Sequence, residues 1–273
     1  MTDVPAPDLP PAARPGEVLF ARYAYPPNEL GYCGEGDGRE WLEVASNGSA
    51  AGSVAVHPGS GPSQVSTAVA DRARVFDGAW PYLQFLAQTA GVRDPLDPVV
   101  AEAYWVGNHL LDAVDPAAFG DHARHFFGTQ AGADWECLAV GPPTAVPHHS
   151  FHVFAIYPWM GMLRRTGSPQ ALQVLDRCRI RWGRAIAVDG DSLHVRSRPL
   201  TWDGQTVRLG SSRVESARWA ADGRSLLREV RAGQWVSLHW GWVCDVLTGR
   251  QLRALRTYTA RQLTLTNRSA SRR

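Results

Sequence analysis

Residues 179–200, RIRWGRAIAVDGDSLHVRSRPL, decide the second half of the fold, because apolar and polar side chains alternate along most of them. Two alternating runs flank Asp189-Gly190-Asp191, and a glycine turn between two such runs is typical of a β-hairpin. The alternation continues through residues 206–219, and residues 233–247, GQWVSLHWGWVCDVL, form an apolar run that predicts one further strand. Several short strands separated by glycine turns favour a small β-barrel.

The chain after these strands predicts a helix. Apolar side chains recur at helical spacing through residues 245–263 and would share one face: Leu247, Leu252, Leu255, Tyr258 and Leu263. The polar residues that follow, 266–273, are expected to be disordered.

The start of the chain combines a tail, a short helix and a loop. Residues 1–16 are rich in Pro and Ala and are expected to be disordered. Glu17–Tyr25 predicts a short helix that Pro26-Pro27 ends, because proline lacks the N–H donor and clashes with the preceding turn. Residues 31–64 are rich in Gly, Ser and Asn and predict a loop with at most one weak strand.

From Ser63 onward the pattern is helical. Residues 63–91 suggest two helices. Asp97-Pro98 and Asp115-Pro116 predict the starts of two more, with aspartate as the N-cap and proline at the first helical position. Residues 150–167 indicate a last helix, interrupted at Pro158.

These patterns predict the fold class α+β with two domains. A mostly helical domain is expected over residues 17–172. A small OB-type β-barrel with a C-terminal helix is expected over residues 173–265, with disordered tails at 1–16 and 266–273.

Composition excludes several functions. The chain has 273 residues and a formal net charge of +2, which does not suggest nucleic-acid binding driven by bulk charge. All 28 basic residues are arginine, so a lysine nucleophile, a Schiff base and a Walker lysine are ruled out. No run approaches the roughly 20 apolar residues of a membrane span, and the first residues do not read as a signal peptide. We therefore expect a cytoplasmic protein with reduced thiols and no membrane partner.

Two runs near the C-terminus carry a family resemblance. The run from Cys178 to Ile186, CRIRWGRAI, places a glycine five residues after a cysteine, and an apolar strand follows. The later run AGQWVSLHWGW, from Ala232 to Trp242, contains His239. In this order, with a helical tail behind them, they resemble the HypC/HupF-type hydrogenase maturation chaperones across residues 176–262. In that family the cysteine stands at the N-terminus, whereas 177 residues precede Cys178 here.

The resemblance implies an accessory protein rather than an enzyme. Members of that family carry an iron fragment with cyanide and carbonyl ligands from a HypD-type scaffold protein to the large-subunit precursor of a [NiFe] hydrogenase. It implies that Cys178 is the main iron ligand and His239 a supporting one, with iron held transiently. Thiolate and imidazole suit such a soft ferrous centre.

The surroundings of Cys178 leave its role open at the sequence level. If Arg177–Trp182 is extended, Cys178, Ile180 and Trp182 share one face. The cysteine is then either buried and inert or a ligand whose pKa the flanking arginines lower. His239 is likewise either a ligand or an ordinary strand histidine.

Further candidates lie in the helical half. His148 and His152 would be one turn apart on a helix and could share a metal ion, or these polar residues satisfy the free amides of a helix start. Cys33, between Tyr32 and Gly34, would suit an exposed ligating thiol or have no role. Cys137 and Cys244 have apolar neighbours and are expected in the core.

The helical half also carries a resemblance of its own. Residues 20–34, YWVGNHLL and HHSFHVFAIYPW together look similar to an uncharacterised helical family linked to actinobacterial hydrogenase gene clusters. Two other functions stay open: a Cys/His-dependent enzyme or metal-binding protein using this half, and a nucleic-acid-binding barrel. The barrel would use stacking tryptophans, namely Trp182, Trp202, Trp235, Trp240 and Trp242.

Overall fold

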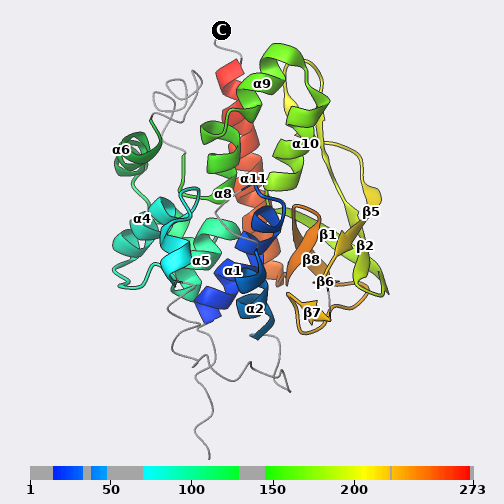
Figure 1. The fold of residues 1–273 in the computed structure, drawn as a ribbon. Helices are drawn as coiled ribbons and strands as arrows, with labels where there is room; N and C mark the ends of the chain where they lie inside the picture. The colour runs from blue at the N-terminus through cyan, green and yellow to red at the C-terminus, as the bar shows by residue number, and fades with distance from the viewer. Residues whose placement is uncertain (1–14, 33–37, 48–69, 129–144, 222, 271–273) are drawn as a thin grey trace, which may run out of the picture.

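A computed structural model of the chain describes residues 15–32, 38–47, 70–128, 145–221 and 223–270. Most helices lie on one side of the molecule and the strands lie on the other, with the first and last helices between them (Figure 1). The fold class is therefore α+β, as predicted. Along the described residues, every helix is too short or too polar to cross a membrane.

The first half is helical, and local signals set several of its boundaries. Asp97 and Asp115 cap their helices as predicted, because their carboxylates accept hydrogen bonds from the backbone N–H groups of Val99 and Ala117 at 2.9 and 3.1 Å. The elements are α1 (Pro15–Glu29), α2 (Arg39–Asn47), α4 (Trp80–Ala90), α5 (Pro98–Trp105), the 3₁₀-helix η1 (His109–Asp112) and α6 (Pro116–Phe127).

Two predictions for the start of the chain were wrong. Helix α1 begins at Pro15 and continues through Pro26-Pro27 to Glu29, because most of its residues are buried against α2, α5 and the strands. Residues 39–47 of the predicted loop form α2, since burial of Trp41 and its apolar neighbours on α1 outweighs the weak local signal. Tertiary packing overrides local preference in both places.

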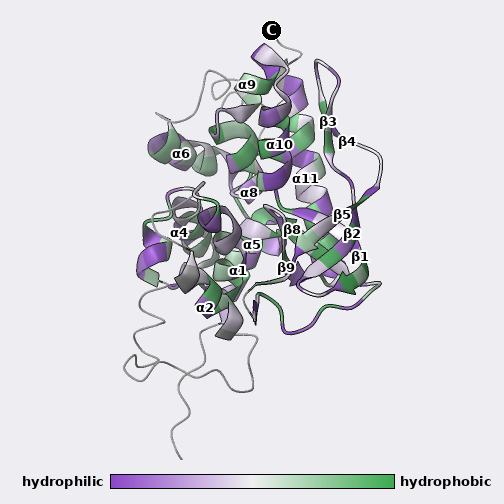
Figure 2. Ribbon diagram, turned by 45° about the vertical axis from the view of Figure 1, so that its right-hand side comes forward, coloured by the Kyte–Doolittle hydropathy of each residue, from purple (hydrophilic) through white to green (hydrophobic). Residues whose placement is uncertain are grey.

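The middle of the chain consists of short helices around Pro158. The predicted interruption there is confirmed, since Pro158 directly precedes α9. The elements are α8 (His149–Phe151), the π-helix η2 (His152–Ile156), α9 (Trp159–Thr166) and α10 (Pro169–Cys178). Both hydrophobic and hydrophilic residues occur along α9 and α10 (Figure 2). The buried residues Met160 and Leu163 in α9, and Ala171 and Leu175 in α10, recur at three- or four-residue spacing, as one face of an amphipathic helix requires.

The extended conformation considered for Arg177–Trp182 holds only for the last residues of that run. The cysteine is the last residue of α10, and β1 begins only at Arg181. Ser168 caps this helix by accepting a hydrogen bond from the Ala171 N–H at 3.2 Å, and Pro169 follows at the first helical position. Ser168 and Pro169 therefore indicate the start of this helix in the sequence, whereas the alternating arginines at its end suggest a strand.

The second half contains a mixed sheet that closes on itself. Its strands pair in the order β1-β2-β5-β9-β8, and β8 also pairs with β1. Neighbours run antiparallel except β5 and β9, which run parallel. These strands are β1 (Arg181–Asp189), β2 (Ser192–Ser197), β5 (Arg213–Arg218), β8 (Trp235–His239) and β9 (Trp242–Val246); two small ladders join β3 (Leu200–Trp202) to β4 (Val207–Leu209) and β6 (Ala220–Ala221) to β7 (Arg224–Ser225).

The turns of this sheet confirm one prediction and correct another. The predicted hairpin around Gly190 joins β1 to β2, and this glycine has a φ of 54°. The apolar run 233–247 was predicted as one strand but forms the hairpin β8–β9. Its turn residues, Trp240 and Gly241, have φ values of 49° and 85°. Positive φ at both central positions gives the tight turn that two twisted antiparallel strands need.

Helix α11 (Gly249–Ala270) closes the fold. It carries Leu252, Leu255, Tyr258 and Leu263 of the predicted face, but it begins only at Gly249, so Leu247 lies before it and residues 245–246 belong to β9. It also runs to Ala270, so residues 266–270 of the predicted disordered tail are helical. Residues 1–14 and 271–273 of the predicted tails lie outside the described residues. One hydrophobic cluster joins the two halves, since Phe20 and Trp105 pack in it together with Trp242 and Leu255.

Candidate metal centre

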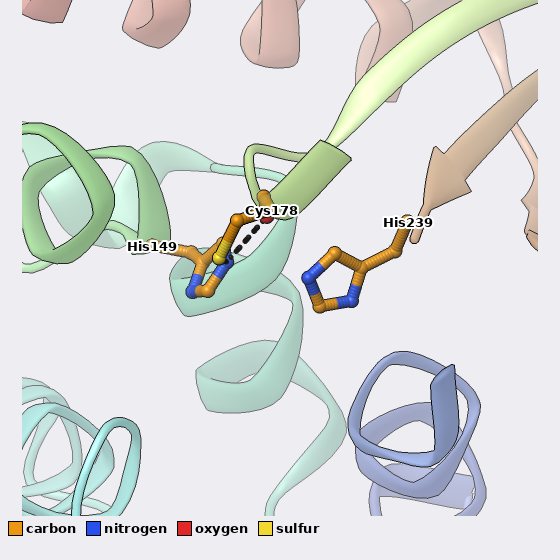
Figure 3. Close-up of side chains that lie close together, drawn as sticks. All are labelled: His149, Cys178 and His239. Atoms are coloured by element: carbon orange, nitrogen blue, oxygen red, sulfur yellow. Dashed lines mark hydrogen bonds between the residues drawn. The ribbon is translucent and has the colours of Figure 1, made fainter. Parts of the chain in front are cut away.

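Three buried side chains from three different elements meet beneath the sheet. His149 begins α8, Cys178 ends α10 and His239 ends β8 (Figure 3). One potential ligand atom from each lies within 4.8 Å of the other two. The Cys178 sulfur is 4.0 Å from Nε2 of His149, and the imidazole of His239 faces the pair from the opposite side.

Local contacts hold the sulfur and the strand histidine together. The Trp240 N–H, just after His239, donates a hydrogen bond of 2.9 Å to the carbonyl of Arg177, just before Cys178. This bond fixes the β8–β9 turn onto the last turn of α10. Trp240 has the positive φ that non-glycine residues rarely adopt, and such strain is concentrated at functional sites.

The tautomer of His239 is set by helix α1. Its Nδ1–H donates to the carbonyl of Tyr23 at 2.8 Å, so the neutral ring carries a lone pair on Nε2. Pro27, four residues after Tyr23, has no N–H to offer this carbonyl, which makes it available to the histidine. Nε2 is buried and makes no hydrogen bond among the described residues, and the Cys178 carbonyl lies close enough to the ring to oppose the lowering of its pKa. Metal-binding histidines commonly donate their other nitrogen to a carbonyl in this way.

His149 has polar partners at both nitrogens. Its Nε2 lies 2.9 Å from the carbonyl oxygen of Cys178, and its Nδ1 lies 3.0 Å from the hydroxyl of Tyr104. The Trp105 ring packs against both site histidines, with centroids 4.7 Å from His149 and 5.8 Å from His239. The histidines are thus held between an aromatic wall and the end of α10.

Burial keeps the site histidines neutral. It lowers the pKa of His149 to about 4, a shift that the Cys178 carbonyl partly opposes. Burial also lowers the pKa of His239 well below its usual value, and the nearby His149 adds to this effect. Neutral imidazole is the form that coordinates metals, so the surroundings prepare both rings for that role.

The donor set fits a soft or borderline transition metal. One thiolate and two imidazoles are ligands of Zn²⁺, copper and iron, and three protein ligands leave a coordination position open. Metal–ligand bonds of about 2.0–2.3 Å place two ligands of one ion roughly 3–4 Å apart, so the three atoms need only a small closing movement. The unpartnered lone pair of His239 is the group that an ion satisfies.

The structure separates the predicted histidine pair from this cluster. His148 is the N-cap of α8, and its Nδ1 accepts a hydrogen bond from the Ser150 N–H at 3.1 Å. This confirms the alternative that these residues satisfy free amides of a helix start. Because His148 has an extended backbone and His152 opens a π-helix, the two are not one regular helical turn apart. His152 instead bonds through Nδ1 to the Tyr82 hydroxyl at 3.0 Å.

Sequence reasoning missed His149. Helical spacing within the histidine run favours the pair His148 and His152. The ligand-like histidine is the middle one, and its neighbours Cys178 and His239 come from distant parts of the chain. No local spacing marks such a site.

The remaining cysteines and the tryptophans considered for nucleic-acid binding are not part of this cluster of Cys178, His149 and His239, as far as the described residues show. Cys33 and Cys137 lie outside the described residues, and Cys244 is in the core, as predicted. Trp240 and Trp242 are buried, and the Arg256 guanidinium covers Trp182 and Trp235 with centroid distances of 5.9 and 4.8 Å. Trp202 is half-buried.

Comparisons with other proteins place the chain in a family. Searches of curated proteins and of solved structures return no significant match. A family model, DUF6390, a family of unknown function, matches residues 12–273. The chain therefore belongs to the DUF6390 family.

Proposed function

We propose that this protein binds a soft transition-metal ion through Cys178, His239 and His149 and serves as an accessory protein in metallocentre assembly. The observation that carries the proposal is the buried Nε2 lone pair of His239, which has no partner among the described residues and faces a cysteine sulfur. A buried polar atom without a partner costs about 1–3 kcal/mol, and a bound ion removes that cost.

The resemblance to HypC/HupF-type chaperones supports a specific cargo. That cargo is the iron fragment with cyanide and carbonyl ligands, received from a HypD-type scaffold and passed to a hydrogenase large-subunit precursor. The closed ring of strands serves as an OB-type barrel that supplies His239. We place the handover in the cytoplasm, where thiols stay reduced.

The secondary-structure elements that carry the three ligands suggest how the bound metal could be released. Cys178 and His239 are tied together through the bond between Trp240 and Arg177, whereas His149 comes from α8. All three side chains are buried. The buried site must open for the metal to be released. We propose that it opens where α8 packs on the end of α10 and the β8–β9 turn, because α8 is not part of the Trp240–Arg177 hydrogen bond.

Replacing Cys178 with alanine is expected to abolish tight metal binding. Purified metal-free protein titrated with Co²⁺ should show thiolate-to-cobalt charge-transfer absorption, and Cys178→Ala should lose it. Cys244→Ala is the matched control, since Cys244 is also buried but its sulfur contacts the Trp242 carbonyl instead. Equal Co²⁺ binding by Cys178→Ala and wild type would refute the metal-site proposal.

The cargo is tested separately in a hydrogenase-producing host. Protein isolated anaerobically is expected to carry substoichiometric iron and to show infrared bands of cyanide and carbonyl stretches. Both signals should vanish in Cys178→Ala and persist in Cys244→Ala. If wild-type protein binds Co²⁺ in vitro yet never carries these bands, the metal site stands and the iron-carrier role is rejected.

A further inference from the structure

We propose that Tyr104 sets the tautomer of His149 and thereby decides whether this histidine can act as the third metal ligand. The inference rests on the metal-binding function proposed above and adds a control element to that site.

Three consecutive contacts connect His149 to two backbone carbonyls. Its Nε2 lies 2.9 Å from the Cys178 carbonyl oxygen, and its Nδ1 lies 3.0 Å from the Tyr104 hydroxyl oxygen. That hydroxyl in turn lies 2.5 Å from the carbonyl oxygen of Gly78. Each end of this line is a carbonyl, which can only accept a hydrogen bond.

Each of these three contacts needs a hydrogen, but His149 and Tyr104 together supply only two. A neutral imidazole has one N–H and a tyrosine has one O–H, so two hydrogens serve three contacts. If Nε2 carries the hydrogen, it donates to the Cys178 carbonyl, and one of the two contacts of the Tyr104 hydroxyl lacks a hydrogen. If Nδ1 carries it, Nδ1 donates to Tyr104 and Tyr104 donates to Gly78, while Nε2 keeps a lone pair.

In the second arrangement the Cys178 thiol can donate its hydrogen to Nε2, and a metal ion takes the place of that hydrogen. In that tautomer the Nε2 lone pair faces the Cys178 sulfur at 4.0 Å. An ion bound there satisfies the lone pair, and both remaining contacts keep their hydrogens. Binding in this tautomer leaves the His149 ring neutral with its hydrogen on Nδ1, acquired by proton exchange, so the net release is one proton, from the Cys178 thiol.

The two site histidines therefore differ in whether their hydrogen-bond partners already fix the tautomer that can bind a metal ion. His239 already donates Nδ1–H to the Tyr23 carbonyl and presents a lone pair on Nε2. His149 can bind an ion through Nε2 only in the tautomer that carries its hydrogen on Nδ1; in the other tautomer Nε2–H donates to the Cys178 carbonyl. An ion is thus held first by Cys178 and His239, and His149 completes the site through Tyr104.

Tyr104→Phe tests this role, and Tyr82→Phe is a matched control. Both hydroxyls are buried and lie 3.0 Å from Nδ1 of a histidine, but the partner of Tyr82 is His152, outside the cluster. Co²⁺ titration is expected to show ~10–100-fold weaker binding for Tyr104→Phe and wild-type binding for Tyr82→Phe. His149→Ala should match Tyr104→Phe, and the double variant should lose no more.

Nitrogen NMR of the imidazole rings gives a readout that does not depend on binding affinity. In wild-type protein loaded with Zn²⁺, we expect His149 to carry its hydrogen on Nδ1. Metal-free Tyr104→Phe should show the hydrogen on Nε2, because the Cys178 carbonyl is then the acceptor that remains.

The outcomes separate this inference from the proposed function. Hydrogen on Nε2 of His149 in the Zn²⁺-loaded wild type would overturn the role of Tyr104 and remove His149 from the ligand set, with Cys178 and His239 still binding the ion. Wild-type Co²⁺ affinity in Tyr104→Phe would overturn the role of Tyr104 and leave all three ligands in place. Absence of Co²⁺ binding by the wild type would instead reject the metal site, and the tautomer inference would fall with it.

Discussion

Acidification from pH 7 to about pH 4.5 should unfold this protein, because it buries several neutral histidines. Burial lowers the pKa of His148 and His152 to about 3 and that of His149 to about 4. In the unfolded chain these rings take up protons near their usual pKa of about 6.5. Below that value the unfolded state binds more protons than the folded state, so the free energy of unfolding falls with falling pH.

The effect is large because the histidines act together. Each one removes up to about 1.4 kcal/mol per pH unit, and burial also lowers the pKa of His239, so the four together remove up to about 5–6 kcal/mol per unit between roughly pH 5.5 and 4.5. Domains have only about 5–15 kcal/mol of stability to lose. Urea unfolding followed by tryptophan fluorescence at a series of pH values measures this slope.

His152→Gln isolates one contribution. Glutamine keeps an amide that can pair with the Tyr82 hydroxyl but cannot titrate, so the slope should fall by about a quarter. A free energy of unfolding that stays constant from pH 7 to 4.5 in the wild type would contradict the burial of neutral histidines.

Replacing Asp176 with alanine is expected to destabilise the fold by about 3–5 kcal/mol, because it leaves a buried charge without its partner. Asp176 Oδ1 accepts hydrogen bonds from Nε and Nη2 of Arg179 at 3.2 and 2.9 Å, and from the Leu200 N–H at 2.9 Å. The Arg179 side chain is 1% exposed. Burial lowers its pKa to about 10, while the charge of Asp176 opposes that shift.

Asp121→Ala provides the matched control for this change. Asp121 pairs with Arg124 at 2.7 Å with the same three-residue spacing, but both side chains are more than half exposed, at 76% and 51%. Solvent screens such a pair, and its loss should cost under about 1 kcal/mol. Urea unfolding of both variants tests the comparison, and equal small losses would show that the buried pair contributes little.

The candidate site shows how far local patterns reach. Cys178 and His239 were singled out from two runs of sequence, and the structure brings them together. Cys178 is the last residue of a helix, which its sequence neighbours do not indicate, because the arginines around it also fit an extended strand. A role for His149 is not predicted from the sequence, because Cys178 and His239 lie far away along the chain. The neighbours of His149 instead suggest the pair His148 and His152.

The amino-acid sequence by itself determined the α+β class, the aspartate-capped helices and the hairpin at Gly190, since each depends on residues within a few positions of one another. Only the tertiary structure decided that α1 continues through Pro26-Pro27 and that the carbonyl of Tyr23 orients His239. The physical reason is distance along the chain. Capping and turn formation are local, whereas the tautomer and burial of a side chain depend on groups that only folding brings into contact.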